Sequence, residues 1–286
     1  MDLGIGLPTS GRHASPEAIM RVAQAAERAG LGAVWTYERL LRPAEAMVAG
    51  TDQSMPLPDN LAVVYDPLET LAFVAAGTST IRLGTSVVDA LFHAPVVLAK
   101  RLATLDRLSG GRAMIGLGQG WMQQEFDAAG VPVGRRGAGF EEHIAAMRAC
   151  WGPDPVRFDG RFYTIPESQI GPKPTGLTLL AGAAAPAAIE RAARLGVGLT
   201  VVGFAWEQLR QAVDAYGEGQ GPLVVQVNGE ITDKALDERM PLTGSAEQVA
   251  EDLAEVRGMG VDHVLWQPFD ADPEEMVERI GRLAAR

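Results

Sequence analysis

The sequence predicts an α/β protein, a (β/α)8 TIM barrel with insertions at the C-terminal face of its sheet. Short apolar segments alternate along the chain with amphipathic helical segments, which is typical of a parallel sheet with helical crossovers. Eight strand candidates occur within 286 residues, and roughly 250 residues is the usual size of an eight-stranded α/β barrel. No linker or low-complexity stretch divides the chain, so we expect a single domain over residues 1–286. A doubly wound sheet is the alternative, and it usually has fewer strands.

The first half of the chain contains four strand candidates, each followed by helical sequence. The strands are predicted at 3–7, 33–36, 81–88 and 113–117, and the helices at 16–30, 66–76, 95–108, 123–129 and 141–151. The first helix shows the signals clearly. Ser15 is an N-cap residue, Pro16 occupies the first helical position, and Gly30 ends the helix.

The second half restores the alternation after an irregular stretch. Strands are predicted at 177–181, 199–202, 223–227 and 261–266, and helices at 186–195, 206–216, 245–259 and 273–285. Residues 158–163 predict a small hairpin with an Asp-Gly turn. Two stretches, 38–65 and 152–176, are too long for ordinary βα loops, and loops at the C-terminal face of a barrel are where its sites are built.

Composition excludes several classes of function. The balance of 25 basic against 36 acidic residues gives a net charge of −11, which argues against a nucleic-acid partner and an anionic membrane surface. Cys150 is the only cysteine, so an intrachain disulfide and a Cys-based metal cluster are excluded, and we expect a buried thiol. The four histidines lack the spacing of a zinc site, so no metal is expected. The N-terminus lacks a signal-peptide pattern and no apolar run is long enough to cross a bilayer, so we expect a cytoplasmic protein.

A glycine-rich turn follows the strand at 113–117. Gly116, Gly118 and Gly120 would let backbone amides approach a ligand, and the next helix start offers the positive end of a dipole. Trp121 stands where the dinucleotide fingerprint would need glycine, so this is not that motif. A tight turn without a ligand is the alternative.

A second turn of small residues follows the strand at 177–181. The segment Ala181-Gly182-Ala183-Ala184 exposes main-chain N–H groups ahead of a helix, which suits a phosphate. Close packing of the helix on the strand is the alternative. Two such turns in one barrel favour a phosphorylated cofactor.

Charged residues at predicted strand ends are further candidates. Glu38 and Arg39 end the second strand, Glu125 lies one helical turn beyond Trp121, and His93 follows the third strand. A solvated Glu38–Arg39 pair and a surface or hydrogen-bonded role for His93 are the alternatives. No G-x-S-x-G elbow occurs and no lysine lies at a strand end, so a hydrolase and a Schiff-base aldolase are not expected.

The ordered set of motifs resembles the bacterial luciferase-like family, in particular its deazaflavin F420-dependent oxidoreductases. The set comprises residues 81–87, 95–100 and 104–112, the glycine turn with Trp121 and Glu125, and residues 243–250 and 260–264. Each piece is weak alone, and the order of all of them along nearly the whole chain is specific.

The resemblance implies a barrel, usually dimeric, that binds FMN or F420 at its C-terminal mouth. It places a non-proline cis peptide at Ser86-Val87, next to Thr85, against the back of the tricyclic ring. It also places Gly118 and Gly120 beside the ring, with Gln124 close behind. The turn formed by Ala181, Gly182, Ala183 and Ala184 would receive the cofactor phosphate.

The sequence departs from the family pattern in three places. Glu38-Arg39 replaces an Asp-His pair, and a permanently charged arginine cannot serve as a neutral base. Trp121 stands where the family's glucose-6-phosphate dehydrogenases have a catalytic glutamate, so that activity is not expected. Residues 195–198 lack the aspartate often found in the family's Ala-Asp-Gly turn.

We therefore expect an oxidoreductase that moves a hydride between F420 and a small organic substrate. Glu38 and Arg39 would compensate each other's charge and polarise the ring edge or substrate, and Trp121 would form a wall of the pocket. An FMNH2-dependent monooxygenase is the alternative, with FMN as its cofactor, and a catalytically idle flavin-binding barrel is the second. The expected partners are the substrate and a second copy of the chain.

Overall fold

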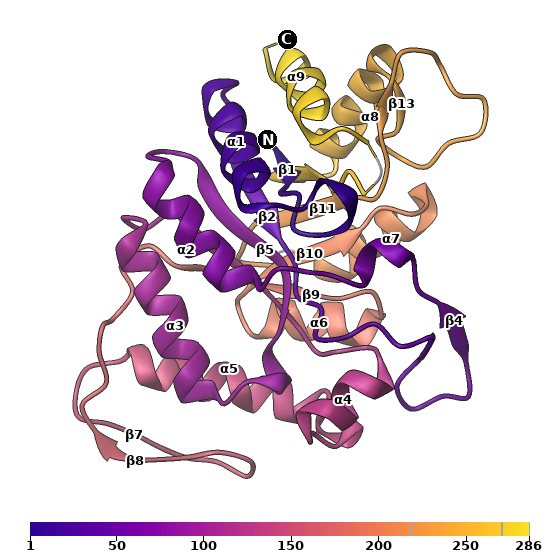
Figure 1. Cartoon of the computed structure of the whole chain (residues 1–286). Coiled ribbons are helices and arrows are strands. Elements are labelled where there is room, and N and C mark those ends of the chain that lie inside the picture. The colour runs from indigo at the N-terminus through magenta and orange to yellow at the C-terminus, as the bar shows by residue number, and fades with distance from the viewer. Residues whose placement is uncertain (218, 270, 286) are drawn as a thin grey trace.

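The computed structural model describes residues 1–217, 219–269 and 271–285. Within these residues, eight parallel strands form a closed barrel, which confirms the predicted fold class (Figure 1). Around the barrel the strands follow the order β1-β14-β11-β10-β9-β6-β5-β2. Their bounds are β1 (Asp2–Gly6), β2 (Ala33–Thr36), β5 (Arg82–Asp89), β6 (Ala113–Gly118), β9 (Thr178–Gly182), β10 (Gly198–Val202), β11 (Leu223–Val227) and β14 (His263–Trp266).

Helices surround the barrel and bury their apolar faces on it (Figure 1). They are α1 (Pro16–Arg28), α2 (Pro67–Gly77), α3 (Pro95–Leu108), α4 (Gln123–Ala129), α5 (Ala138–Trp151), α6 (Pro186–Arg194), α7 (Trp206–Tyr216), α8 (Ala246–Gly258) and α9 (Pro273–Ala284). The predicted start of α1 is confirmed, because the Ser15 hydroxyl accepts a hydrogen bond from the Ala18 amide at 3.1 Å. The last helix, α9, packs on α1 and β1, so the two ends of the chain meet on one side of the barrel.

The barrel interior is filled by side chains, with Trp35 as the largest. Trp35 is 1% exposed and pairs across the sheet with Gly84 of β5. A Cβ at Gly84 would lie 2.3 Å from the Trp35 ring, and one at Gly4 would lie 2.8 Å from its indole nitrogen. Glycine on both neighbouring strands therefore leaves room for the indole, and the interior of the barrel around it is a packed core.

Two excursions leave this scaffold. Residues 38–65 follow β2 and contain an antiparallel pair, β3 (Glu45–Met47) and β4 (Ser54–Pro56), at the C-terminal end of the barrel. Residues 152–176 connect α5 to β9 and contain the predicted hairpin, β7 (Val156–Asp159) and β8 (Thr164–Ser168), which packs on α5. Its last pair is Asp159 with Thr164, so the connection has four residues, and the expected two-residue Asp-Gly turn was wrong. The short parallel pair β12 (Ile231–Thr232) and β13 (Gly244–Ser245) was not predicted.

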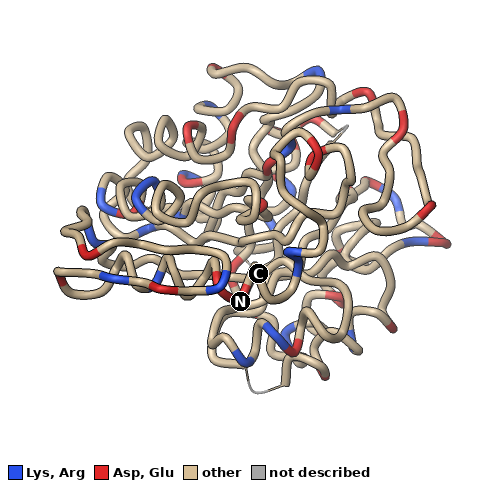
Figure 2. The backbone as a smooth tube through the Cα atoms, turned by 90° about the horizontal axis from the view of Figure 1, so that it is seen from below, with Lys and Arg blue, Asp and Glu red and all other residues tan. Residues whose placement is uncertain are grey.

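Charged positions of both signs are interspersed along the chain (Figure 2). None of the helices within the described residues combines the length and the apolar character needed to cross a membrane.

Candidate functional site at the mouth of the barrel

Ionisable side chains gather where three neighbouring strands end. The strands β2, β5 and β6 are consecutive in the barrel, and parallel strands bring their C-terminal ends to one rim. The rim and the segments that follow it supply five such side chains: Glu38, Arg39, Asp89, His93 and Glu125. Their contacts with one another are specific.

Glu38 is buried at 6% exposure and both of its carboxylate oxygens are bound. Oε2 accepts the Asp89 amide at 2.7 Å, and Oε1 lies 2.8 Å from Nε2 of His93. The Glu38 amide itself donates to the Val87 carbonyl at 2.9 Å. The carboxylate therefore joins the end of β2 to the segment that follows β5.

Arg39 faces a different partner. Its Nη1 lies 2.5 Å from Oε2 of Glu125, a side chain that is 1% exposed. The other oxygen of Glu125 accepts the Leu40 amide at 2.8 Å. The guanidinium also lies 5.4 Å from the ring centroid of Trp121, within range of a cation–π contact. The expected mutual pairing of Glu38 with Arg39 is wrong, because successive residues of an extended chain point to opposite sides.

Asp89 is a site residue that the sequence reasoning missed. It is 6% exposed, and its Oδ1 accepts the Gly120 amide at 2.9 Å. Burial, followed by the charges of Glu38 and Glu125, raises the pKa of Asp89 to about 7. The sequence contained a signal for it, because Asp89 is an acidic residue directly after the apolar strand predicted at 81–88.

Glu125 adds a third carboxylate to the same small volume. Burial raises its pKa, although the charge of Arg39 works in the opposite direction. Three carboxylates (Glu38, Asp89 and Glu125) therefore share one permanent cation, Arg39. With a pKa of about 7, the Asp89 carboxyl is partly protonated near neutral pH. Among the described residues, no group of three or more His, Cys, Asp and Glu is arranged to hold a metal ion.

The peptide bond between Ser86 and Val87 is cis, as the family resemblance implied. It lies at a register break between Thr85 and Val88 in the pairing of β5 with β6. The Thr85 hydroxyl is buried and donates to the Gly116 carbonyl at 2.9 Å.

The side chains of Ser86 and Val87 have separate neighbours. The Ser86 hydroxyl lies 2.7 Å from Oε1 of Gln226 and 3.2 Å from the Thr200 hydroxyl, so it connects β5 to the far side of the barrel. A Cβ at Gly118 would lie 2.6 Å from Val87, and one at Gly182 would lie 2.7 Å from it. Glycine at both positions therefore avoids a clash with the Val87 side chain.

The glycine turn after β6 is shaped by its neighbours. Gly120 has a φ of +73°, and a Cβ there would lie 2.8 Å from Phe126 and 2.9 Å from Phe92. The Gln124 side chain accepts the Met47 amide at 3.1 Å and donates to the Glu45 carbonyl at 2.8 Å. Gln124 thus anchors β3 beside the turn, and its role toward a cofactor stays a prediction.

The small-residue turn ends β9 and leads into α6. The Ala183 amide donates to the Thr200 carbonyl at 3.2 Å, whereas Ala184 is exposed. Ala185 is the N-cap residue of α6 and its side chain makes no capping hydrogen bond. Pro186, the first residue of α6, has no N–H, and the Ala188 amide donates to the Ala185 carbonyl at 2.9 Å. The Ala187 amide is therefore the main-chain donor of this turn that is available to a phosphate.

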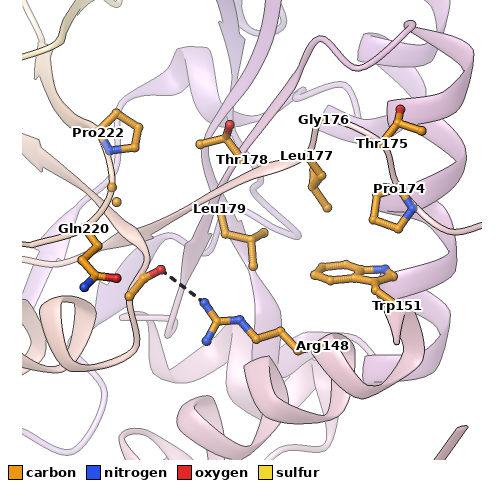
Figure 3. Close-up of a pocket in the computed structure, with 13 residues that line it drawn as sticks. Arg148, Trp151, Pro174, Thr175, Gly176, Leu177, Thr178, Leu179, Gln220 and Pro222 are labelled. Carbon is orange, nitrogen blue, oxygen red and sulfur yellow. Dashed lines mark hydrogen bonds between the residues drawn. The ribbon is translucent and has the colours of Figure 1, made fainter. Parts of the chain in front are cut away.

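A cavity of about 670 Å³ lies at the opposite end of the barrel (Figure 3). It is lined by residues that precede β9, β10 and β11, together with Arg148 and Trp151 of α5. Among the described residues that line it, Arg148 is the single charged side chain. Its guanidinium donates to the carbonyls of Leu195 at 2.8 Å and Gly196 at 3.3 Å. This cavity contains none of the five clustered side chains of the mouth.

The fold and the rim site together define an eight-stranded α/β barrel with an acid/base cluster at its C-terminal mouth. The family model described as luciferase-like monooxygenase matches residues 1–221. The chain belongs to the luciferase-like monooxygenase family, which confirms the resemblance read from the sequence.

Three relatives show the range of the family. An uncharacterised protein of Mycobacterium tuberculosis (strain ATCC 25618 / H37Rv) is 38% identical over 188 residues, covering 64% of this chain and 66% of that protein. The FMNH(2)-dependent dimethylsulfone monooxygenase of Pseudomonas fluorescens (strain Pf0-1) is 31% identical over 51% of this chain and 42% of that protein. The F420-dependent glucose-6-phosphate dehydrogenase of Amycolatopsis mediterranei (strain U-32) is 27% identical over 68% of this chain and 56% of that protein. The matches therefore span less than two thirds of these relatives.

Two solved structures share the fold along the whole chain. The monooxygenase RslO1 from Streptomyces bottropensis has a TM-score of 0.80 at 22% identity, covering 100% of this chain and 99% of that one. An F420-dependent secondary alcohol dehydrogenase in complex with an F420-acetone adduct has a TM-score of 0.81 at 16% identity, covering 99% and 97%.

Proposed function

We propose that this protein is an F420-dependent oxidoreductase that transfers a hydride between the deazaflavin and a small organic substrate. The observation that supports it most is the buried cluster of Glu38, Asp89 and His93 beside the cis Ser86–Val87 peptide, in a chain of this family. A hydride transfer to or from a carbonyl or alcohol also moves a proton, and this cluster holds exchangeable protons at the mouth.

The residues present fit a phosphorylated flavin or deazaflavin. The α6 end of the Ala181-Gly182-Ala183-Ala184 turn would hold the phosphate, because the Ala187 amide is available there. Thr85, Ser86 and Val87 would support the ring from behind, and Gly118 and Gly120 would lie beside it. When bound, the cofactor supplies the hydride chemistry, while the protein supplies position, electrostatics and exclusion of water.

The proposal assigns a separate role to each of the expected catalytic residues Glu38, Arg39 and Trp121. Arg39 polarises an anionic or carbonyl substrate from the rim, since its guanidinium is permanently charged and its side chain is partly exposed. Trp121 forms a wall of the pocket beneath that guanidinium. Glu38 acts indirectly, by positioning the Asp89 amide and the His93 ring that its carboxylate binds.

Direct titration tests the choice of cofactor. Purified protein is titrated with F420 and with FMN while cofactor and tryptophan fluorescence are recorded. We expect F420 to bind at least tenfold more tightly than FMN. Micromolar FMN binding without F420 binding would instead support an FMNH2-dependent monooxygenase, as in the dimethylsulfone relative, and oxygen consumption would then be measured. Binding of neither cofactor would indicate an idle barrel and overturn the proposal.

We also propose a homodimer through the outer faces of α2 and α3. Phe73 of α2 is 46% exposed and Val97 of α3 is 55% exposed, so both neighbouring helices present an apolar side chain to solvent. The two helices pack together, and Arg101 of α3 bridges to Glu69 of α2 at 2.6 Å beside them. Light scattering of the wild type and of Phe73→Glu should give a dimer and a monomer, respectively, and a monomeric wild type would contradict this proposal.

A further inference from the structure

His93 is the most accessible side chain in the rim cluster. Its side chain is 16% exposed, against 4% for Glu38, 12% for Arg39 and 1% for Glu125. A reactant that approaches the cluster therefore meets an imidazole that can both release and accept a proton.

The position of His93 is fixed from two directions. On one side its Nε2 contacts Oε1 of Glu38, whose other oxygen is bound by the Asp89 amide. On the other side its carbonyl accepts a hydrogen bond from Nε2 of His143 at 3.0 Å. His143 is completely buried, and its ring meets the Tyr163 ring edge-on at 5.4 Å. The Glu38 contact holds the imidazole itself, and the His143 contact holds the main chain of His93.

The hydrogen bond from His143 also defines the state of that second histidine. A carbonyl only accepts, so His143 Nε2 carries the hydrogen, and its Nδ1 has no partner. Burial lowers the pKa of His143 to about 4, so this ring stays neutral at physiological pH. His143 therefore has a structural role, and His93 is the histidine of this pair that can transfer protons.

We propose that His93 is the proton-carrying catalytic residue of the cofactor site and that Glu38 is its positioning residue, an assignment that rests on the proposed function. The titratable and charged groups around the imidazole are Glu38 after β2, Asp89 at the end of β5, the neutral His143 of α5, and the Arg39–Glu125 pair. Because Nε2 is held by Glu38, Nδ1 is the atom left for a substrate. A buried carboxylate behind an imidazole orients the ring and stabilises its protonated form.

The proton balance is simple. With the cofactor bound, reduced F420 would supply a hydride to a carbonyl carbon, the C=O π bond would break, and the cofactor would be left oxidised. The electron pair released to oxygen then takes the Nδ1 proton of His93. The imidazole becomes neutral and regains a proton from solvent. Oxidation of an alcohol runs the same transfer in reverse, with oxidised F420 as the hydride acceptor.

Nuclear magnetic resonance of the imidazoles tests this without a known substrate. The chain has four histidines, so a sample labelled at histidine Cε1 gives four resonances, assigned by single His→Gln variants. We expect the His93 resonance to move with pH in the wild type and to shift again when F420 binds. His263 lies at the start of β14, at the other end of the barrel, and its resonance should be unmoved by F420.

Two isosteric variants separate positioning from general charge. In Glu38→Gln the shift of the His93 resonance on binding F420 should fall at least twofold, because the carboxylate that faces Nε2 of the ring is lost. Glu125→Gln removes a buried carboxylate that does not contact His93, and it should reduce that shift by less than half as much.

The outcomes distinguish this inference from the proposed function. A His93 resonance that ignores pH, or ignores bound cofactor, would overturn the proton-carrying role while leaving cofactor binding intact. Equal shifts in Glu38→Gln and Glu125→Gln would remove the positioning role of Glu38. Failure of both F420 and FMN to bind the wild type would instead overturn the proposed function itself. If FMN alone binds, it replaces F420 as the probe in the same experiment.

Discussion

Replacing Asp89 by asparagine should make the protein more stable at alkaline pH and have little effect at acid pH. The asparagine side chain has the same shape, and its amide oxygen could still accept the Gly120 amide hydrogen. What the variant loses is a buried negative charge beside Glu38 and Glu125. The wild type has to ionise Asp89 in that environment as the pH rises.

The size of the effect follows from the two pKa values of Asp89. Its ordinary value is 3.8, and burial together with the neighbouring carboxylates raises it to about 7 in the folded protein. Between these two pH values the folded chain keeps a proton that the unfolded chain has released, so stability is lost as the pH rises through that window. One pKa unit corresponds to about 1.4 kcal/mol, so most of the loss, about 2–3 kcal/mol, falls between pH 5 and pH 8.

Urea unfolding followed by circular dichroism at pH 5.0 and pH 8.0 measures this effect. The free energy of unfolding of Asp89→Asn minus that of the wild type should be about 2–3 kcal/mol larger at pH 8.0 than at pH 5.0, so the variant gains relative stability at alkaline pH. Asp159→Asn, which changes an exposed aspartate of β7, should show no such dependence. Equal differences at the two pH values would refute the reasoning, because Asp89 would then be ionised throughout.

Two further predictions concern the surroundings of the cluster. Burial lowers the pKa of His143 from 6.5 to about 4, so the folded protein loses stability as the pH falls through that window. The stability of His143→Gln relative to the wild type should therefore be about 2 kcal/mol greater at pH 4.5 than at pH 7.5, as measured by urea unfolding. If His143→Gln behaves identically at both pH values, the ring is protonated in the native state. Gly182→Ala should weaken F420 binding at least tenfold by fluorescence titration, because its Cβ would displace Val87 from the rim. Gly258→Ala is the matched control, since a Cβ there meets no atom within 4 Å. Equal affinity of both variants for F420 would mean that Gly182 serves packing alone and has no effect on cofactor binding.

The barrel could be predicted because its strands and helices are specified locally. Alternation of apolar runs with amphipathic segments, bounded by caps and glycines, is a property of neighbouring residues. The bounds of β2, α3, α7 and β11 agree with their predictions residue for residue. The pairs β3–β4 and β12–β13 contain only two or three residues per strand and depend on contacts elsewhere in the fold, so no local pattern announces them.

The site was predicted in its location but not in its connections. Glu38, Arg39 and the glycine turn do gather at the rim, because strand ends of a parallel barrel converge. Which partner each charge meets depends on side-chain direction and on segments far along the chain. Thus Glu38 meets His93 after β5, and Arg39 meets Glu125 of α4. Asp89 directly follows the predicted strand, but its local sequence does not show that its carboxyl is buried near Glu38 and Glu125, which come from distant segments.

Arg39 and Glu125 should behave as one energetic unit, separate from the neighbouring Glu38. Removing the cation alone leaves the Glu125 carboxylate, which is 1% exposed, buried without its partner, and such a loss costs about 3–5 kcal/mol. Removing both charges together avoids most of that penalty.

A double-mutant cycle of Arg39→Met and Glu125→Gln, measured by urea unfolding at pH 8, should therefore give a coupling of about 1–3 kcal/mol. Met retains an apolar stem beside Trp121, and Gln can still accept the Leu40 amide, so the cycle isolates the charges. The corresponding cycle of Arg39→Met with Glu38→Gln should give a smaller coupling, since those side chains bind different partners. A larger coupling to Glu38 would mean that the two adjacent charges act on each other after all, and that the mouth of the barrel contains one charge network where the structure shows two.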